Sequence, residues 1–261
     1  MNLDLSGKRA VVCGATQGIG LATAQELASM GAQLCLIARN ETSLKEAVLT
    51  LSTAQNQSHD YIVADFSQPD VLRQKAEQYA ETHEVDILVN NTGGPKGGEA
   101  IAADVSEFLL AFNMHLICNQ HLAQVFSASM KANGFGRIVN IISTSVKIPL
   151  KGLGVSNTIR GAVANWSKTL ANELGKFNIT VNNVLPGATN TARLNSIIET
   201  KAGKTNSDKT SVGEAMKSII PMARFAEAQE IANAVAFLCS KSASYISGVN
   251  LPVDGGRTGS L

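Results

Sequence analysis

Short hydrophobic runs recur along the chain and predict β-strands. Seven runs rich in Val, Ile and Leu have apolar side chains at almost every position, which is typical of parallel strands covered on both faces. They span residues 8–13, 33–38, 61–64, 85–89, 137–142, 179–185 and 249–253. The pattern therefore predicts a parallel sheet of about seven strands.

Segments between these runs carry the 3.6-residue period of amphipathic helices. The clearest stripes lie in residues 104–131 (Val105, Phe108, Leu109, Phe112 and Leu116) and in residues 156–175 (Ile159, Ala162, Val163, Trp166 and Leu170). Strand alternating with helix implies right-handed crossovers. We therefore expect a single α/β domain over residues 1–261, a doubly wound Rossmann-type sheet with helices on both faces.

One segment interrupts the alternation. Residues 189–220 are polar and separate the sixth predicted strand from the last helix. Connections of this length in a compact domain are usually functional lids or disordered segments. We interpret residues 189–220 as a substrate lid.

Charge and composition exclude several classes of protein. The 261 residues contain 22 Lys and Arg against 21 Asp and Glu, a net charge of +1, which argues against nucleic-acid binding. No apolar run reaches the 18 residues that a membrane span needs, and the first residues lack a signal pattern. The four widely separated cysteines indicate reduced thiols in a cytoplasmic protein, and the histidine spacing predicts no metal site.

The first strand runs into a glycine-rich turn, Cys13-Gly14-Ala15-Thr16-Gln17-Gly18-Ile19-Gly20, followed by a helix. Such a turn lets the backbone approach a pyrophosphate, and the free N–H groups of the helix face the anion. An ordinary turn between strand and helix is the alternative. The sequence pattern indicates both the strand before the turn and the helix after it, near the start of the chain. We therefore predict a dinucleotide site that includes Gly14, Thr16, Gln17, Gly18, Ile19 and Gly20.

The end of the second strand indicates which dinucleotide binds. An acidic residue there would bond the adenosine ribose, but the chain has Ala38 followed by Arg39. Arginine pairs well with a 2′-phosphate, so NADP(H) is favoured over NAD(H). A solvated loop arginine is the alternative interpretation. Asp65, which closes the third strand, is placed to cap the adenine end.

Motifs in a fixed order extend over nearly the whole chain. After the glycine turn and Ala64-Asp65 come Asn90-Asn91-Thr92-Gly93, the 139–143 strand end, Pro186-Gly187 and the 247–256 terminal motif. The chain thereby resembles the short-chain dehydrogenase/reductase family, most of all its 3-oxoacyl-carrier-protein reductase type. The resemblance implies NAD(P)-dependent carbonyl/alcohol interconversion. It also implies further cofactor contacts at Phe66, Asn91, Gly93, Arg160, Pro186, Gly187, Thr189 and Thr191.

The catalytic positions of that family are only partly filled. Ser143 matches the serine that polarises the substrate carbonyl, and Asn113 is matched to the asparagine that supports a water relay. The family's proton-donating tyrosine and its lysine four residues later fall on Ser156 and Arg160. The three tyrosines, Tyr61, Tyr79 and Tyr245, have no lysine four residues on. The usual acid/base pair is therefore absent from the chain.

The replacements retain only part of that chemistry. Arg160 can bind ribose hydroxyls but keeps its proton, and a serine hydroxyl is a far weaker acid than a phenol. Substitute proton donors are Ser156 itself, Thr144, a bound water, or Lys147, for which an exposed loop position is the alternative interpretation. The glycine-rich segment 93–98 suggests a flexible rim, with Pro95 and Lys96 as substrate contacts.

Two hypotheses about function follow. The first is an NADP(H)-dependent oxidoreductase acting on a ketone or a 3-oxoacyl-type substrate with an atypical acid/base set. The second is a nicotinamide-nucleotide-binding protein without redox turnover, acting as a sensor, partner subunit or scaffold. The intact binding motifs favour the enzyme. By the resemblance, the two long helices also imply a homo-oligomer, a dimer or tetramer.

Overall fold

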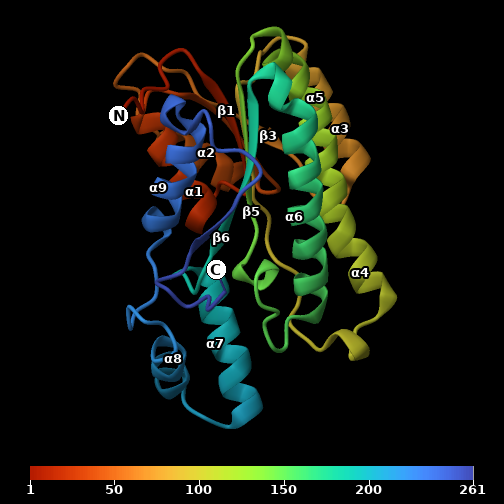
Figure 1. Ribbon diagram of the computed structural model, residues 1–261, viewed down its shortest axis with the longest axis vertical. Coiled ribbons are helices and arrows are strands. Elements are labelled where there is room, and N and C mark those ends of the chain that lie inside the picture. Colours follow the sequence, from red (N-terminus) through yellow and green to blue (C-terminus); the bar gives the residue numbers. More distant parts are fainter. Residues whose placement is uncertain (261) are drawn as a thin grey trace.

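The computed structural model describes residues 1–260, which build one parallel sheet of seven strands (Figure 1). The strand order is β3-β2-β1-β4-β5-β6-β7. Each strand matches a predicted run to within two residues at either end, so the predicted fold class is confirmed. The bounds are β1 (Arg9–Cys13), β2 (Gln33–Ala38), β3 (Asp60–Val63), β4 (Ile87–Asn90), β5 (Gly136–Ile141), β6 (Ile179–Pro186) and β7 (Asn250–Val253).

Helices cover both faces of the sheet, as continuously hydrophobic strands require. One layer consists of α1 (Gly18–Ser29), α2 (Glu41–Leu49) and α9 (Ala228–Cys239); the other consists of α3 (Pro69–Ala80), α5 (Cys118–Ala132) and α6 (Gly154–Leu174) (Figure 1). Each layer has its own cluster of buried apolar side chains against the strands. Within residues 1–260, no helix has the length and apolar character needed to cross a bilayer.

The strand order reverses between β1 and β4, both of which lie in the middle of the sheet. At such a reversal the following connections leave toward opposite faces, so a crevice opens beyond the carboxyl ends of the two strands. The glycine turn follows β1 and the Asn90–Gly93 motif follows β4. Both predicted motifs therefore meet at the edge of the sheet where ligands bind in this fold.

The helix predicted over residues 104–131 has an irregular middle. It consists of α4 (Val105–Phe112), a π-helical turn over Asn113–Ile117, and α5. A π-helical turn inserts a residue into the helical repeat and is frequent at functional sites. The insertion rotates the residues after Asn113 relative to those of α4. It therefore changes which side chain of this helix enters the crevice.

The 189–220 segment folds largely into two helices, α7 (Ala192–Thr205) and α8 (Lys209–Lys217), beyond the carboxyl edge of the sheet (Figure 1). The side chain of Thr191 caps α7 by accepting a hydrogen bond from the N–H of Leu194. Leu194, Ile220 and Phe225 form a small buried cluster of their own. This cluster gives the segment a defined position next to the crevice.

A ladder of four asparagines, three of them buried, crosses four strands at the edge of this crevice. Asn90, Asn140, Asn183 and Asn250 stand opposite one another in the pairing of β4 through β7. Each side-chain amide donates to the next carbonyl oxygen, at 2.8, 3.0 and 2.8 Å. Asn140 also donates to Ser167 of α6 at 3.2 Å. The ladder fixes the strand ends that carry the Asn91–Gly93 loop and Ser143.

Replacing the centre of the ladder is expected to destabilise the fold. Asn140→Leu keeps the volume but leaves the amide of Asn90 and the carbonyl oxygen of Asn183 buried without partners. Because each such orphan costs about 1–3 kcal/mol, we expect the free energy of unfolding to fall by about 2–6 kcal/mol, measured by urea denaturation. Asn172→Leu on the exposed side of α6 is the matched control and should change it by about 0.5 kcal/mol or less. Equal effects of the two variants would contradict a stabilising role for the ladder.

Candidate nucleotide-binding and active site

The glycine turn after β1 forms a close-packed cradle. Gly14 has a φ of +58°, and a β-carbon there would lie 2.6 Å from the carbonyl oxygen of Asn91. A β-carbon on Gly20 would collide with the carbonyl oxygen of Gly14. The Asn91 side chain donates to the carbonyl oxygens of Cys13 and Gly14, both at 3.2 Å. These contacts account for the glycines and join the loop after β4 to the turn.

The amino end of α1 is open to an anion. Gln17 precedes the helix but makes no side-chain capping bond, and the first turn contains no acidic residue. The first N–H groups of the helix are therefore free to bind a negatively charged group. Gly18 faces Thr191, since a β-carbon at Gly18 would lie 3.3 Å from the Thr191 methyl carbon. The cradle, the uncapped helix and Thr191 together fit a pyrophosphate.

The ends of β2 and β3 carry Arg39 and Asp65, the two residues predicted to bind the adenosine half of a nucleotide. Arg39 is exposed directly after β2. Asp65 follows β3, and its carboxylate accepts a 2.9 Å bond from the N–H of Ser67; this bond, with a smaller contribution from the charge of Arg39, lowers the pKa of Asp65. Phe66 is buried in the core, and its carbonyl oxygen accepts a hydrogen bond from the thiol of Cys118 at 3.3 Å, so the structure directs its side chain away from the crevice.

Ser143, Ser156 and Arg160 lie at the other end of the crevice. Ser143 follows β5, and its Oγ accepts a 3.1 Å hydrogen bond from the N–H of Ser145. Ser156 and Arg160 are one turn apart in α6, and Arg160 is buried with its Nη1 donating to the carbonyl oxygen of Ile141 at 3.2 Å. The bond to Ile141 holds the guanidinium against the end of the strand that leads to Ser143.

His115 is a site residue that the sequence reasoning missed. Its ring is 1% exposed, its Nδ1 lies 2.5 Å from the hydroxyl of Thr92, and its Nε2 is buried without a hydrogen-bond partner. Burial, together with the positive charge of Arg160, lowers the pKa of His115 to about 2, so the imidazole is neutral at physiological pH. The histidine lies between the loop after β4 and the arginine of α6.

Asn113, the residue predicted for this position, does not face the site. Its side chain is exposed. Residues two apart in a helix point to nearly opposite sides, so the helix that directs His115 inward directs Asn113 outward. The structure therefore places His115, and not Asn113, toward the loop after β4 and Arg160. In the sequence, His115 is the one polar residue between Met114 and Leu116, and this pattern could have indicated a functional side chain.

The buried histidine predicts a specific loss of stability in acid. An unfolded chain takes up a proton on His115 below pH 6.5, whereas the folded protein does not do so until about pH 2, so falling pH favours unfolding. Between pH 6.5 and 5.0 we expect the free energy of unfolding to fall by about 2 kcal/mol more in the wild type than in His115→Asn, measured by urea denaturation. Parallel pH dependence of the two proteins would show that the ring is protonated in the fold.

The other predicted proton donors are near Ser143. Thr144 is buried in the short helical turn Thr144–Val146, and Lys147, half-buried, ends that turn. All three tyrosines lie elsewhere. Tyr61 bonds Glu41 of α2, Tyr79 bonds Asp60 at the start of β3, and Tyr245 is fully exposed after α9. No phenol from residues 1–260 therefore reaches Ser143.

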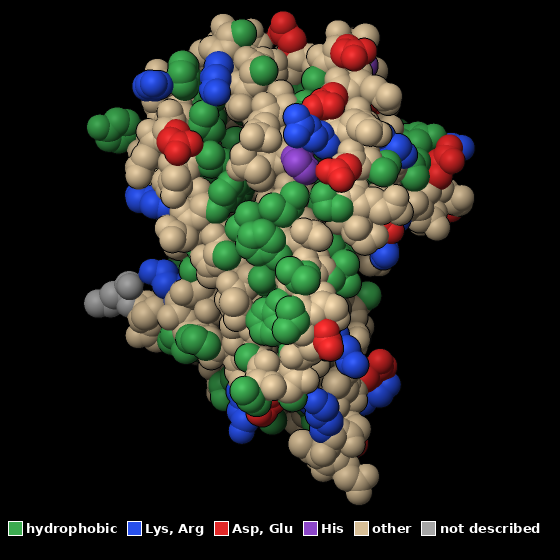
Figure 2. Space-filling model, turned by 90° about the vertical axis from the view of Figure 1, so that its right-hand side faces the viewer, with side chains coloured by type: hydrophobic (Ala, Val, Ile, Leu, Met, Phe, Trp, Pro, Cys, Tyr) green, Lys and Arg blue, Asp and Glu red, His purple; other side chains and the backbone are tan. Residues whose placement is uncertain are grey.

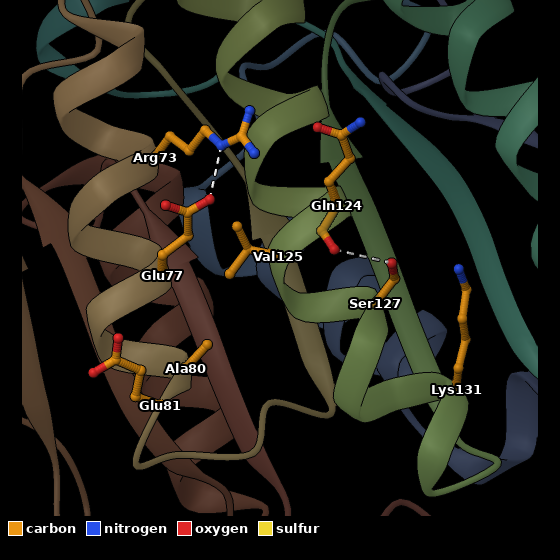
Figure 3. Close-up of a pocket in the computed structure, with 8 residues that line it drawn as sticks. All are labelled: Arg73, Glu77, Ala80, Glu81, Gln124, Val125, Ser127 and Lys131. Carbon is orange, nitrogen blue, oxygen red and sulfur yellow. Dashed lines mark hydrogen bonds and ion pairs between the residues drawn. The ribbon is translucent and has the colours of Figure 1, made fainter.

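A separate groove lies on the outer surface between α3 and α5 (Figure 3). It is lined by polar and charged side chains, among them Arg73 and Glu77, which form an ion pair at 2.8 Å. The groove shares no residue with the crevice. In the described part of the chain, no three His, Cys, Asp or Glu side chains cluster as metal ligands would. The crevice is the candidate site.

Comparisons with known proteins agree with this geometry. Residues 14–258 match the family described as enoyl-(acyl carrier protein) reductase. The NADPH-dependent reductase BacG of Bacillus subtilis is 30% identical over 98% of this chain and 100% of its own length. A tropinone reductase homolog of Arabidopsis thaliana is 35% identical, over 98% of this chain and 91% of its own.

A solved structure extends the likeness to three dimensions. L-sorbose reductase from Gluconobacter frateurii, complexed with NADPH and L-sorbose, superposes with a TM-score of 0.93 at 30% identity, covering all of both chains. With the family match over nearly the whole length, the chain belongs to the short-chain dehydrogenase/reductase family of oxidoreductases.

Proposed function

We propose that the protein is an NADP(H)-dependent oxidoreductase that interconverts a carbonyl and an alcohol. The observation that carries the proposal is the glycine cradle under the uncapped amino end of α1, with Ser143 and Arg160 at the far end of the same crevice. Arg39 favours the 2′-phosphate of NADP(H) over NAD(H). Relatives named as NADPH-dependent support the same choice.

Each end of the crevice has a separate task. The cradle and Thr191 hold the pyrophosphate, Arg39 and Asp65 the adenosine half, and Arg160 the hydroxyls of the nicotinamide ribose. Asn91, Gly93, Pro186, Gly187 and Thr189 are proposed as the nucleotide contacts between these two ends. Ser143 donates its hydroxyl proton to the carbonyl oxygen and so orients it. A bound nicotinamide nucleotide supplies or accepts the hydride.

Proton transfer is the weakened part of this machinery. Burial, with the charge of nearby Arg193, lowers the pKa of Arg160 to about 10, which still leaves it charged at neutral pH. The imidazole of His115 is neutral at that pH, so it cannot act as an imidazolium acid. Ser156 therefore acts by orienting a water, or Lys147 donates the proton. General acid catalysis is typically worth ~10²–10⁴ in rate, so we expect slow but measurable turnover.

The alternative is a nucleotide-binding protein without redox chemistry, and the absence of a tyrosine near Ser143 favours it. A measurement of turnover distinguishes this alternative from the enzyme. The experiment follows NADPH consumption at 340 nm, about the wavelength of its reduced ring, against ketones and 3-oxoacyl thioesters. The proposal expects turnover above that of Gly18→Asp, which fills the cradle and adds a negative charge. NADPH binding without turnover on any acceptor would favour the sensor or scaffold.

The α7–α8 segment is proposed as the substrate lid of this single domain. Its position beyond the carboxyl edge of the sheet and its separate small core support a unit that covers the crevice. The rim after β4, with Pro95 and Lys96, lies opposite. The four cysteines are buried and free. They support the proposed cytoplasmic location, where thiols stay reduced.

We further propose a homo-oligomer assembled through α4. Apolar side chains on this helix face solvent: Val105 is 71% and Leu109 61% exposed, and Ile101 just before it is 96% exposed. Figure 2 shows the face on which α4 lies, with hydrophobic side chains gathered across its middle. Contiguous exposed apolar surface of this kind marks an interaction site, and a second copy of the chain is the commonest partner.

Leu109→Glu is expected to convert the oligomer to monomers, because it places a charge in the contact. Sedimentation velocity should show the wild type above its 27.4 kDa chain mass and the variant at that mass. Leu49→Glu, at an 85% exposed leucine on α2, is the control and should leave the assembly intact. A wild type that sediments as a monomer would refute the proposed assembly.

A further inference from the structure

Arg193 spans the crevice at its Ser143 end. It lies in the first turn of α7, and its Nη2 donates to the carbonyl oxygen of Pro95 on the rim after β4, at 2.6 Å. Next to this contact, a β-carbon at Gly94 would lie 3.7 Å from Nη2 of Arg193 and 3.9 Å from Nη2 of Arg160. Two guanidinium groups therefore converge on one point above Gly94.

Neither arginine has a protein counter-ion. Among the residues that the structure describes, no carboxylate lies within ion-pair distance of Arg160 or Arg193. Arg160 is buried, and the positive charge of Arg193 lowers its pKa further. Two like charges held together, one of them buried, are unfavourable unless an anion joins them. The cluster is thus built to receive a negative charge from outside the chain.

The position of the cluster distinguishes between a nucleotide phosphate and the substrate as the source of that charge. The pyrophosphate has its own partners at the amino end of α1, opposite Thr191. Arg193 instead reaches past Gly94 toward Arg160, at the end of the crevice where Ser143 orients the carbonyl. Because Nη2 is already engaged by Pro95, one edge of the guanidinium remains free, and an arginine edge matches a carboxylate.

We propose that Arg193 binds the carboxylate of the substrate, so that the site takes an oxo acid and its corresponding hydroxy acid. This inference rests on the proposed function of the same site. The positive edge of the crevice selects the acid over its neutral ester, and the bond from Arg193 to Pro95 connects α7 to the rim while the substrate is held.

Binding without turnover tests this directly. Oxo acids cannot be reduced by the NADP⁺-loaded protein, so calorimetry on that complex measures recognition alone. The probes are 2-oxo and 3-oxo acids with chains of four to ten carbons, each paired with its methyl ester. We expect at least one acid to bind roughly 10- to 100-fold more tightly than its ester, as a charge-assisted bidentate contact provides.

Variants of α7 assign the preference to one side chain. Arg193→Gln should remove the preference for the acid while the Kd for NADP⁺ stays within about twofold, and Arg193→Lys should restore part of it. Lys201→Gln, which removes a positive charge from the exposed side of the same helix, should leave the preference unchanged.

The outcomes separate this inference from the proposed function. If no acid binds more tightly than its ester, or if Arg193→Gln weakens NADP⁺ binding as much as acid binding, Arg193 does not recognise a substrate carboxylate. Reduction of esters but not of acids would overturn the inference and leave the oxidoreductase in place. Tight acid binding that depends on Arg193, with no reduction by the NADPH-loaded protein, would uphold the inference and contradict the proposed turnover.

Discussion

The double substitution Ser156→Tyr with Arg160→Lys is expected to raise the rate of carbonyl reduction by roughly 10²–10³-fold. The two positions are one turn apart on α6, so they project from the same face of the helix toward the end of β5. A phenol is a far stronger acid than a serine hydroxyl, and a lysine beside it lowers the pKa of the phenol further. Measurement of kcat and KM with the best acceptor at saturating NADPH checks the gain.

Two controls separate proton donation from the filling of space. Ser156→Phe with Arg160→Lys introduces the same ring without the hydroxyl and should give no gain in kcat. Arg160→Lys alone shortens the side chain that bonds the carbonyl oxygen of Ile141, and it should weaken nucleotide binding without raising kcat. A folded double variant that binds NADPH yet reduces no faster than the wild type would mean that the crevice no longer places a carbonyl beside residue 156.

Gly20→Ala is expected to weaken NADPH binding by more than about 100-fold, since the pyrophosphate cradle cannot form as observed. The added β-carbon collides with the carbonyl oxygen of Gly14, which is backbone and cannot rotate away, and it would also lie 2.7 Å from the side-chain nitrogen of Asn91. The turn must open, and the N–H groups at the start of α1 then no longer point toward the same anion site. Fluorescence titration with NADPH measures the effect.

Gly203→Ala is the matched control, because a β-carbon at that position in α7 meets no atom within 4 Å. It should bind NADPH like the wild type and be slightly more stable, since alanine favours helix. Thermal unfolding of both variants shows whether the fold survives. A folded Gly20→Ala protein with wild-type affinity would place the nucleotide away from the glycine turn.

Much of the fold is encoded in local pattern. The seven hydrophobic runs predicted the seven strands, because parallel strands covered on both faces are hydrophobic at nearly every position, as in β1, β2, β4, β5 and β6. The crossover rule fixes the handedness of each connection, whereas the strand order is known only from the structure. The polar 189–220 segment lacked this regularity. Its helices rely on a capping threonine and a three-residue cluster, features too small to appear as periodicity.

The candidate site was less predictable where geometry depends on packing. The glycine turn could be recognised because its residues are close in sequence. A tight turn and a close approach of the backbone to an anion both require glycine there. The structure exposes Asn113 and buries His115, which lies two residues later in the π-helical turn, and this difference could not be read from the motif. Arg160 and Arg193 lie on helices far apart in sequence, so no local sequence pattern could predict that their side chains come together.

Titration of the wild-type protein with NADPH, beside NADH, tests the central claim most directly. That claim is that the nicotinamide-nucleotide site is intact, whereas Ser156 and Arg160 replace the family's catalytic tyrosine and lysine. We expect NADPH to bind with a Kd in the micromolar range, and NADH at least about tenfold more weakly because Arg39 finds no 2′-phosphate to pair with. Failure of both nucleotides to bind at millimolar concentration would contradict the account as a whole.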